Sequence, residues 1–477
     1  MNPAPGLRLL RLACLLLPAA CATSTAPGPA GSGEPAGAAI DSREFGAILA
    51  LYPDDYLRNY VDAIGRRLSS VAPRREPAPA FAILDRGEPL LLSTRDGRIA
   101  VSRGLLALVK REDELAGLLA HAIAHLGTGA ADRRAPGEPL RFLEGELGRL
   151  VAADLQAASL LPAGATLQLR EFDDVVERRI DALALARTAA AGYEPAALAG
   201  FLRRLQRVRE LLPDWQANAF LAVHRFSPER IAAIEAAGRA PAWQPVRPFA
   251  RGRDALLKRL DGLDWGPGNP QQGLFIGSRF LQPDMGIRID FPPGWTPINA
   301  PGFVGARQAD GEALLLVNAP RGTAPPAELA RVFAERVARK TGSQVPPPQA
   351  FAAGPWPGYW LRVEALDAGL PLVACYAWVQ AAGTTFRLLG AGLAGHAEAF
   401  CDSVRSLRPL DPAERAEIRA LRLRAVAARP GERLAALGER SGNRWPVELT
   451  AAINGLEAGA ALPAGYLVKI LRAETYY

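Results

Sequence analysis

One apolar helical stripe constrains the fold of this chain more than any other feature. Between residues 113 and 126, apolar side chains recur at the spacing of a single helix face, at Leu115, Leu118, Leu119, Ala122, Ile123 and Leu126. A stripe this continuous has to be covered on folding, which predicts a helix packed against a core. His121 and His125 lie four residues apart in the same segment, so both imidazoles share one side of that helix.

The spacing of these two histidines is that of a metal site. Two imidazoles one helical turn apart offer two nitrogen ligands to zinc, although such a pair without context is more often packed or solvated. Glu177 and Asp181 supply the context, one turn apart on a second predicted helix. Two histidines and a carboxylate leave the fourth position of zinc for water, and Asp181 can fix the tautomer of a ligand histidine. The alternative for Glu177 and Asp181 is an exposed helix face.

Six segments, in order, resemble the zinc metallopeptidase family that includes HtpX, the CaaX prenyl endopeptidase and the lipoprotein or periplasmic proteases of outer-membrane assembly. The resemblance runs from about residue 45 to 234, and its segments are 60–68, 102–106, 114–125, 177–182, 191–195 and 224–231. It implies a mostly helical, zincin-like domain that binds one zinc ion per chain. It also implies that His121, His125 and Glu177 are the zinc ligands, that Asp181 supports them, and that His224 lies near the metal.

The chain departs from the family's H-E-x-x-H motif, because Ala122 stands where the catalytic glutamate is expected. That glutamate takes the proton from the metal-bound water and delivers it to the leaving amine, which a methyl group cannot do. Losing a general base lowers the rate by about 10²- to 10⁴-fold. Glu114 cannot replace it, since it lies roughly 10 Å before His121 along the helix axis. The family's Asn-Ala-Phe segment is also absent, and residues 89–92 stand near its place.

The length of 477 residues predicts several folded units, and the fold class expected from the pattern is α+β. Residues 41–246 are mostly helical, with short strands at 81–84 and 99–101, and are expected to form the zincin-like domain. A linker is expected at 247–275, because the run from 265 to 272 breaks all periodicity. An α+β domain is expected at 276–410, with strands at 287–291, 358–365, 372–380 and 384–389 and helices at 326–340 and 396–407.

Residues 411–477 are predicted to fold as a strand, two helices and a strand. The segments 429–434, 453–456 and 462–470 resemble a LysM module. This resemblance implies contact with the N-acetylglucosamine chains of peptidoglycan. A purely structural appendage is the alternative.

The N-terminus has the pattern of an export signal. Arg8 and Arg11 precede a short apolar run, and residues 18–21 resemble a lipobox that ends at Cys21. We therefore expect a signal peptide at 1–21, lipid on Cys21, and a flexible tether at 22–40 rich in Ala, Gly, Pro, Ser and Thr. This predicts a lipoprotein anchored on the periplasmic side of the bacterial envelope, at the outer membrane. Ordinary signal-peptidase cleavage is the alternative.

Cys375 and Cys401 are the only other thiols of the mature chain. In an oxidising periplasm they could form a disulfide, and two free buried thiols are the alternative.

These patterns support a zinc-binding pseudoenzyme that acts as a binding or chaperone-like factor in envelope or outer-membrane protein quality control. An active metalloendopeptidase is the alternative if another carboxylate, for example from the stretch around Glu144 and Glu146, reaches the metal-bound water. A third reading is a peptidoglycan-binding module on an inert scaffold. Nucleic acid is not expected as a partner, because the net charge of +7 is spread along the chain without a basic cluster.

Overall fold

The computed structural model describes residues 50–71, 79–94, 96–128, 173–212, 224, 226–240, 243–245, 249–266, 268–300, 302–319, 324–341, 345–367 and 370–476. The expected signal peptide, Cys21, the tether, and the stretch around Glu144 and Glu146 lie outside these residues. The described part has the predicted α+β fold class. None of its helices combines the length and apolar character needed to cross a bilayer.

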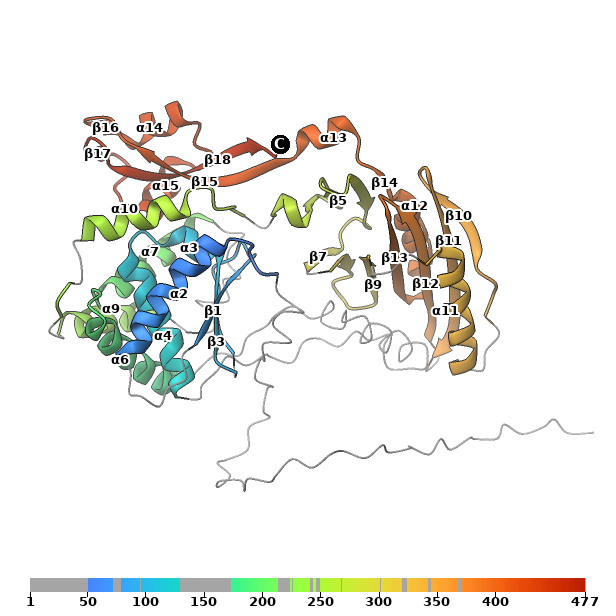
Figure 1. Cartoon of the computed structure of the whole chain (residues 1–477), viewed down its shortest axis with the longest axis horizontal. Helices are drawn as coiled ribbons and strands as arrows, with labels where there is room; N and C mark the ends of the chain where they lie inside the picture. The colour runs from blue at the N-terminus through green and yellow to red at the C-terminus, as the bar shows by residue number, and fades with distance from the viewer. Residues whose placement is uncertain are drawn as a thin grey trace, which may run out of the picture. The chain divides into compact units, whose positions relative to one another are not determined.

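The first unit is organised around α4 (Glu112–Gly127), the predicted helix that carries His121 and His125. Every residue of α4 from Glu112 to His125 is buried, so the apolar stripe is covered as predicted, and the residues outside the stripe are buried as well. Neighbouring helices α2, α6 and α7 contact it (Figure 1). The other helices of this unit are α2 (Asp55–Ser70), α3 (Arg103–Leu108), α6 (Asp174–Ala190), α7 (Ala197–Leu211), α9 (Pro228–Arg239) and α10 (Phe249–Leu260).

A three-stranded sheet lies between α2 and α4 in the chain, in the order β1-β3-β2. Its strands are β1 (Ala80–Leu84), β2 (Leu91–Ser93) and β3 (Arg98–Ser102). The predicted strands are β1 and β3, and they pair in parallel, whereas β2 forms the antiparallel hairpin with β3. Strand β2 was not predicted, and it occupies the place where the family's Asn-Ala-Phe segment is missing.

The second unit contains a seven-stranded antiparallel sheet in the order β10-β11-β12-β13-β9-β8-β7. Helix α11 (Pro326–Thr341) packs on one face through Phe333 against Tyr376, and α12 (Ala397–Ser406) packs on the other face through Phe400. The strands are β7 (Thr296–Ala300), β8 (Phe303–Arg307), β9 (Ala313–Asn318), β10 (Gln349–Ala353), β11 (Trp356–Asp367), β12 (Leu370–Ala381) and β13 (Thr384–Leu393). A smaller sheet, β14-β6-β5-β4, contains β4 (Leu274–Ile276), β5 (Arg279–Gln282), β6 (Ile287–Asp290) and β14 (Arg408–Pro409).

Cys375 of β12 and Cys401 of α12 are buried free thiols. Their side chains are hydrogen-bonded, and this bond lowers the pKa of Cys401 and raises that of Cys375. The two thiols are therefore close together, and their pairing as a disulfide stays a prediction.

The C-terminal unit has the predicted order of strand, helix, helix and strand. Its elements are α13 (Pro412–Glu417), β15 (Arg419–Ala427), β16 (Glu432–Arg433), α14 (Leu434–Ser441), α15 (Val447–Asn454), β17 (Ala461–Leu462) and β18 (Leu467–Thr475). Strand β15 pairs antiparallel with β18, and β16 with β17. Helix α15 ends where Gly455 adopts a left-handed conformation, as the Asn-Gly pair predicts.

The hydrophobic core of the first unit includes residues from α10 and from the C-terminal unit. Leu256 and Leu260 of α10 lie in the same buried cluster as Trp445 and Ile453. Helix α10 falls within the stretch expected to be a linker, and its leucines at helical spacing explain why it packs instead. Lys469 of β18 is fully buried, and its Nζ donates to the backbone oxygens of Ala107 and Val109 at 2.5 and 2.9 Å.

Candidate metal site

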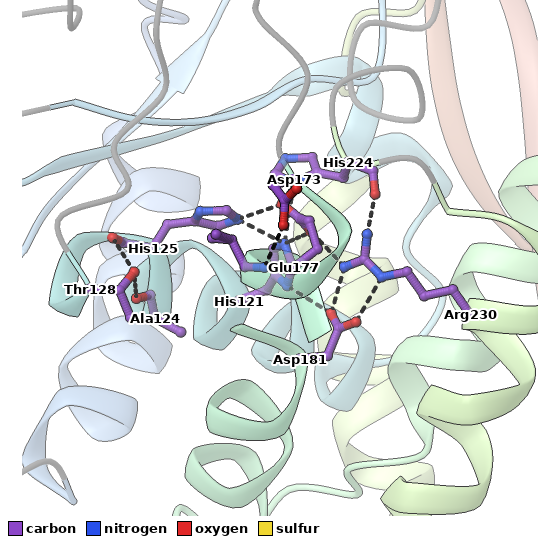
Figure 2. A network of polar contacts seen from close by, with 10 residues as sticks. His121, Ala124, His125, Thr128, Asp173, Glu177, Asp181, His224 and Arg230 are labelled. Atoms are coloured by element: carbon purple, nitrogen blue, oxygen red, sulfur yellow. Dashed lines mark hydrogen bonds and ion pairs between the residues drawn. The ribbon is translucent and has the colours of Figure 1, made fainter. Parts of the chain in front are cut away.

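Four candidate ligands from separate parts of the chain meet in the first unit. His121 and His125 come from α4, Glu177 from α6, and His224 from the segment before α9 (Figure 2). One ligand atom from each residue lies within 4.8 Å of the ligand atoms of the other three. All four side chains are buried. The structure thus brings together the three ligands expected from the sequence and His224.

The ring nitrogens and one carboxylate oxygen converge on a single point. Nε2 of His121 lies 3.2 Å from Nε2 of His125 and 3.3 Å from Nδ1 of His224. Oε1 of Glu177 lies 3.1 Å from the same His224 nitrogen and 3.3 Å from Nε2 of His125. Three imidazoles and a carboxylate are a donor set that suits zinc and similar divalent metals. The cluster can therefore bind a metal, and four protein donors would close a tetrahedral site.

The position of Glu177 follows from how α6 begins. Oδ1 of Asp173 accepts hydrogen bonds from the backbone N–H groups of Val175 and Val176, so Asp173 is the N-cap and Glu177 lies in the first turn. Glu177 is fully buried, as are Ile180 and Ala184 further along the helix. The exposed-face alternative for Glu177 and Asp181 is wrong, because this face packs against α4.

Asp181 lies directly behind His121. Its Oδ1 is 3.3 Å from Nδ1 of His121, on the side of the ring away from the candidate ligands. This is the position expected for a carboxylate that orients a metal-ligating imidazole.

Arg230 is a site residue that the sequence reasoning missed. Its guanidinium donates to Asp181 from Nε at 2.7 Å and from Nη2 at 2.8 Å. The same Nη2 donates to Oε2 of Glu177 at 2.5 Å, and Nη1 donates to the backbone oxygen of His224. The sequence gives only an indirect signal for it: if Glu177 and Asp181 are buried, as the metal-site interpretation requires, they need a compensating cation nearby. Arg230 follows the Ser227-Pro228 helix start by two residues, within the last of the six resembling segments.

The protonation states of the group suit a metal. Burial lowers the pKa of His121 to about 4, with further lowering by His125 and His224 against an opposing contribution from Asp181. Burial alone would raise the pKa of Glu177, but hydrogen bonds from His125 and His224 hold it well below the ordinary value. At neutral pH His121 is therefore neutral and Glu177 ionised, which are the forms that bind metal.

The general-base position is filled by Ala122, which is buried in the core of the first unit. Glu114 is not available as a substitute, because it forms a buried ion pair with Arg204 at 2.5 Å and accepts a hydrogen bond from the backbone N–H of Lys110. Burial alone would raise the pKa of Glu114, but Arg204 holds it below its usual range. The carboxylates of α4, at Glu112, Asp113 and Glu114, all precede His121 by seven residues or more, so none of them stands in for the missing glutamate at position 122.

Comparison with known families connects this region to the peptidases. Residues 91–237 match the profile of Peptidase family M48. The matched stretch contains all four candidate ligands, Ala122 and Arg230. The match supports a metallopeptidase-like domain in this part of the chain. No curated protein matches the chain.

Distant similarities to solved structures were also found. A cyanobacterial PsbP (CyanoP) from Synechocystis sp. PCC 6803 has 14% identity and a TM-score of 0.24, with 30% of this chain and 98% of that chain covered. A protein from Bacteroides thetaiotaomicron VPI-5482 has 12% identity and a TM-score of 0.23, covering 42% and 89%. LpqN of Mycobacterium tuberculosis, described as involved in cell envelope biogenesis, has 17% identity and a TM-score of 0.20, covering 28% and 87%. Similarity at this level says nothing about function.

Proposed function

We propose that this protein binds a metal ion through a metallopeptidase-like site and does not hydrolyse peptide bonds. One observation carries the proposal: Ala122 stands between His121 and His125 in a buried group of four metal-ligating side chains. The ligands of a hydrolytic centre are present, but the residue that would activate water is missing.

The fourth candidate ligand supports the same conclusion. A catalytic zinc ion has three protein ligands and an open position for water, whereas a structural zinc ion has four protein ligands. With His121, His125, Glu177 and His224 as ligands, one zinc ion per chain would be fully coordinated by the protein. The ion would then stabilise the fold by connecting α4, α6 and the segment before α9.

The role that fits such a site is a binding or chaperone-like factor in envelope or outer-membrane protein quality control. The support is the missing general base, together with the resemblance to proteases of outer-membrane assembly and the match to Peptidase family M48. The export signal and the lipobox-like Cys21 favour a lipid anchor on the periplasmic side of the outer membrane. Proteins of that compartment are the partners we expect.

Peptidoglycan binding by the C-terminal unit is a second proposal. It is favoured by the order β15, α14, α15 and β18, which is the strand–helix–helix–strand order of a LysM-like module. The loop at Arg429 and Pro430 stays exposed. Because this unit shares a core with the first unit, binding to insoluble peptidoglycan is best tested in the full chain, by replacing Arg429 and, as a control, the exposed Arg472 of β18. Equal retention of both variants would count against a glycan site at this loop.

A cleavage assay tests the leading proposal. The zinc-loaded full chain is incubated with a fluorescently labelled unfolded protein, with and without a chelator. We expect no chelator-sensitive cleavage, and such cleavage by the unaltered chain would establish the active-peptidase alternative instead.

The same assay on Ala122→Glu asks what else the site lacks. Restoring a general base is worth about 10²- to 10⁴-fold in rate if water can reach the metal. Because His224 would fill the fourth position, we expect Ala122→Glu to gain little alone and more in combination with His224→Ala. Ala122→Gln is the matched control, since its amide has nearly the same size but cannot accept the proton.

A further inference from the structure

We propose that Arg230 is the positioning residue that assembles the metal site, so that the ligands are already in place before a metal binds. The proposal rests on the metal binding proposed above. It concerns the guanidinium group, which contacts Glu177 and Asp181 through their carboxylates and His224 through its backbone oxygen.

The contacts of Arg230 reach ligands from two separate parts of the chain. Glu177 and Asp181 belong to α6, and His224 lies forty-seven residues after Glu177. Asp181 in turn is 3.3 Å from Nδ1 of His121 on α4. One side chain therefore fixes one ligand through its carboxylate, a second through its backbone, and a third through Asp181.

Arg230 contacts Glu177 through the carboxylate oxygen that lies farther from the imidazole nitrogens. Nη2 of Arg230 donates to Oε2, whereas Oε1 lies 3.1 Å from the ring nitrogen of His224 and 3.3 Å from that of His125. Oε2 also lies 3.6 Å from Nε2 of His121, but Oε1, which lies closer to the imidazole nitrogens, is left for the metal. This arrangement argues against the opposite role, in which the guanidinium occupies the place of the metal and competes with it for Glu177.

The guanidinium itself is held firmly. Helix α9 begins with Ser227 as N-cap and Pro228 in the first turn, which fixes the backbone two residues before Arg230. Further along α9, Gly238 lies so close to Ala196 that an added Cβ would be 2.8 Å from the Cα of Ala196. The Phe226 ring lies 4.4 Å from the guanidinium carbon of Arg230. A guanidinium held in this way can orient the carboxylates of Glu177 and Asp181, because it loses little conformational freedom when it forms hydrogen bonds to them.

A pocket makes the idea testable by chemical rescue. It measures about 590 Å³, lies between α6 and α9, and is lined by both Asp181 and Arg230 along with Leu185 and Ile234. Because Asp181 already lines this pocket, truncation of Arg230 to alanine would extend it towards the carboxylate of Glu177. A small guanidinium ion added to the solution then has a route to the vacated position.

Zinc affinity of the full chain, measured by competition with a chromophoric chelator, is the experiment. We compare the unaltered chain with Arg230→Ala, Arg230→Gln and Arg230→Lys. Substitution of a group that orients metal ligands typically weakens binding 10- to 100-fold, and we expect about this loss for Arg230→Ala and Arg230→Gln. Arg230→Lys should recover part of the loss, as should millimolar methylguanidinium added to Arg230→Ala. The visible absorption of bound Co²⁺, which reports coordination geometry, should change in Arg230→Ala and return on rescue.

Arg203→Gln is the matched control. Arg203 of α7 pairs with Glu235 of α9, so this change also removes an arginine–carboxylate pair on α9, but at the surface and away from the site. Its zinc affinity should equal that of the unaltered chain.

The outcomes separate the two proposals. If the unaltered chain binds no zinc, the proposed function fails. If it binds zinc and the Arg230 variants bind as tightly, Arg230 does not position the ligands, and tighter binding would show that it competes with the metal. Circular dichroism identifies any variant that does not fold, and Arg230→Lys, which keeps the charge and most of the length, then decides the question.

Discussion

Replacement of Lys469 by methionine should loosen the C-terminal unit from the core that contains the metal site. Nζ of Lys469 donates to the backbone oxygens of Ala107 and Val109, just before α4 begins. Methionine keeps most of the volume of the lysine stem but offers no donor, so both buried oxygens lose this hydrogen bond. An unsatisfied buried acceptor costs about 1 to 3 kcal/mol, which gives a loss of roughly 2 to 6 kcal/mol for the pair.

The loss should depend on pH in a defined direction. Burial lowers the pKa of Lys469 well below its ordinary value of 10.5. Between the folded and unfolded pKa values the unfolded chain binds more protons, so the unaltered protein gains stability as the pH rises towards 10.5. Methionine does not titrate. The destabilisation by Lys469→Met should therefore be larger at pH 10 than at pH 7, because only the unaltered chain gains stability as the pH rises towards 10.5.

Urea unfolding followed by circular dichroism at pH 7 and pH 10 measures this difference, and hydrogen exchange in α15 reports whether the C-terminal unit opens first. Arg472→Met, at an exposed position three residues further along β18, is the control and should change the free energy of unfolding by less than about 0.5 kcal/mol. Equal stability of Lys469→Met and the unaltered chain at pH 10 would refute the reasoning.

Three further predictions concern buried groups. In the metal-free chain, acidification from pH 6.5 to 4 should lower the free energy of unfolding by about 3 kcal/mol through His121. The pKa of His121 falls to about 4 on folding, so only the unfolded chain takes up a proton over this range. Denaturant titration should show this loss in the unaltered chain and not in His121→Gln. Glu114→Gln should lower the free energy of unfolding, measured in urea, by about 3 to 5 kcal/mol, because buried Arg204 loses its charged partner. Glu235→Gln at the surface should lower it by less than about 1 kcal/mol. Exposure to a mild disulfide oxidant should join Cys375 and Cys401 and stabilise the chain by about 3 kcal/mol. If both of these thiols can still be titrated in the unfolded, oxidised chain, no disulfide has formed.

Local pattern was enough to predict the helices that carry the site. The periodic stripe of residues 113–126 predicted α4, and the second predicted helix, which carries Glu177 and Asp181, is α6. Helical spacing and capping are encoded within a few residues, so both helices could be found locally. The same reasoning placed β6, β11, β12 and β13 of the second unit and the order of elements in the C-terminal unit, but it did not predict β7, β8, β9 and β10 of the large sheet. The prediction that Glu177 lies beside His121 and His125 depended on the family resemblance. Spacing within one helix cannot show which residues of a distant helix lie next to it.

The features that the sequence did not predict depend on long-range contacts. The hydrogen bonds of Lys469 cross more than 350 residues of chain to Ala107 and Val109, and a single buried lysine has no local signature. Helix α10 was predicted to be part of a linker because the Gly- and Pro-containing run at 265–272, which follows it, has no periodicity. Arg230 was overlooked because an arginine in the first turn of a helix is usually solvated, and its role is visible only once both carboxylates are known to be buried.

The zinc content of the purified full chain tests the central claim most directly. The chain is stripped with chelator, reloaded with zinc, dialysed and analysed for metal alongside a variant in which His121 and Glu177 are both replaced by alanine. We predict about one zinc ion per unaltered chain and almost none in the variant. A metal-free unaltered chain, or equal zinc in both proteins, would contradict the account.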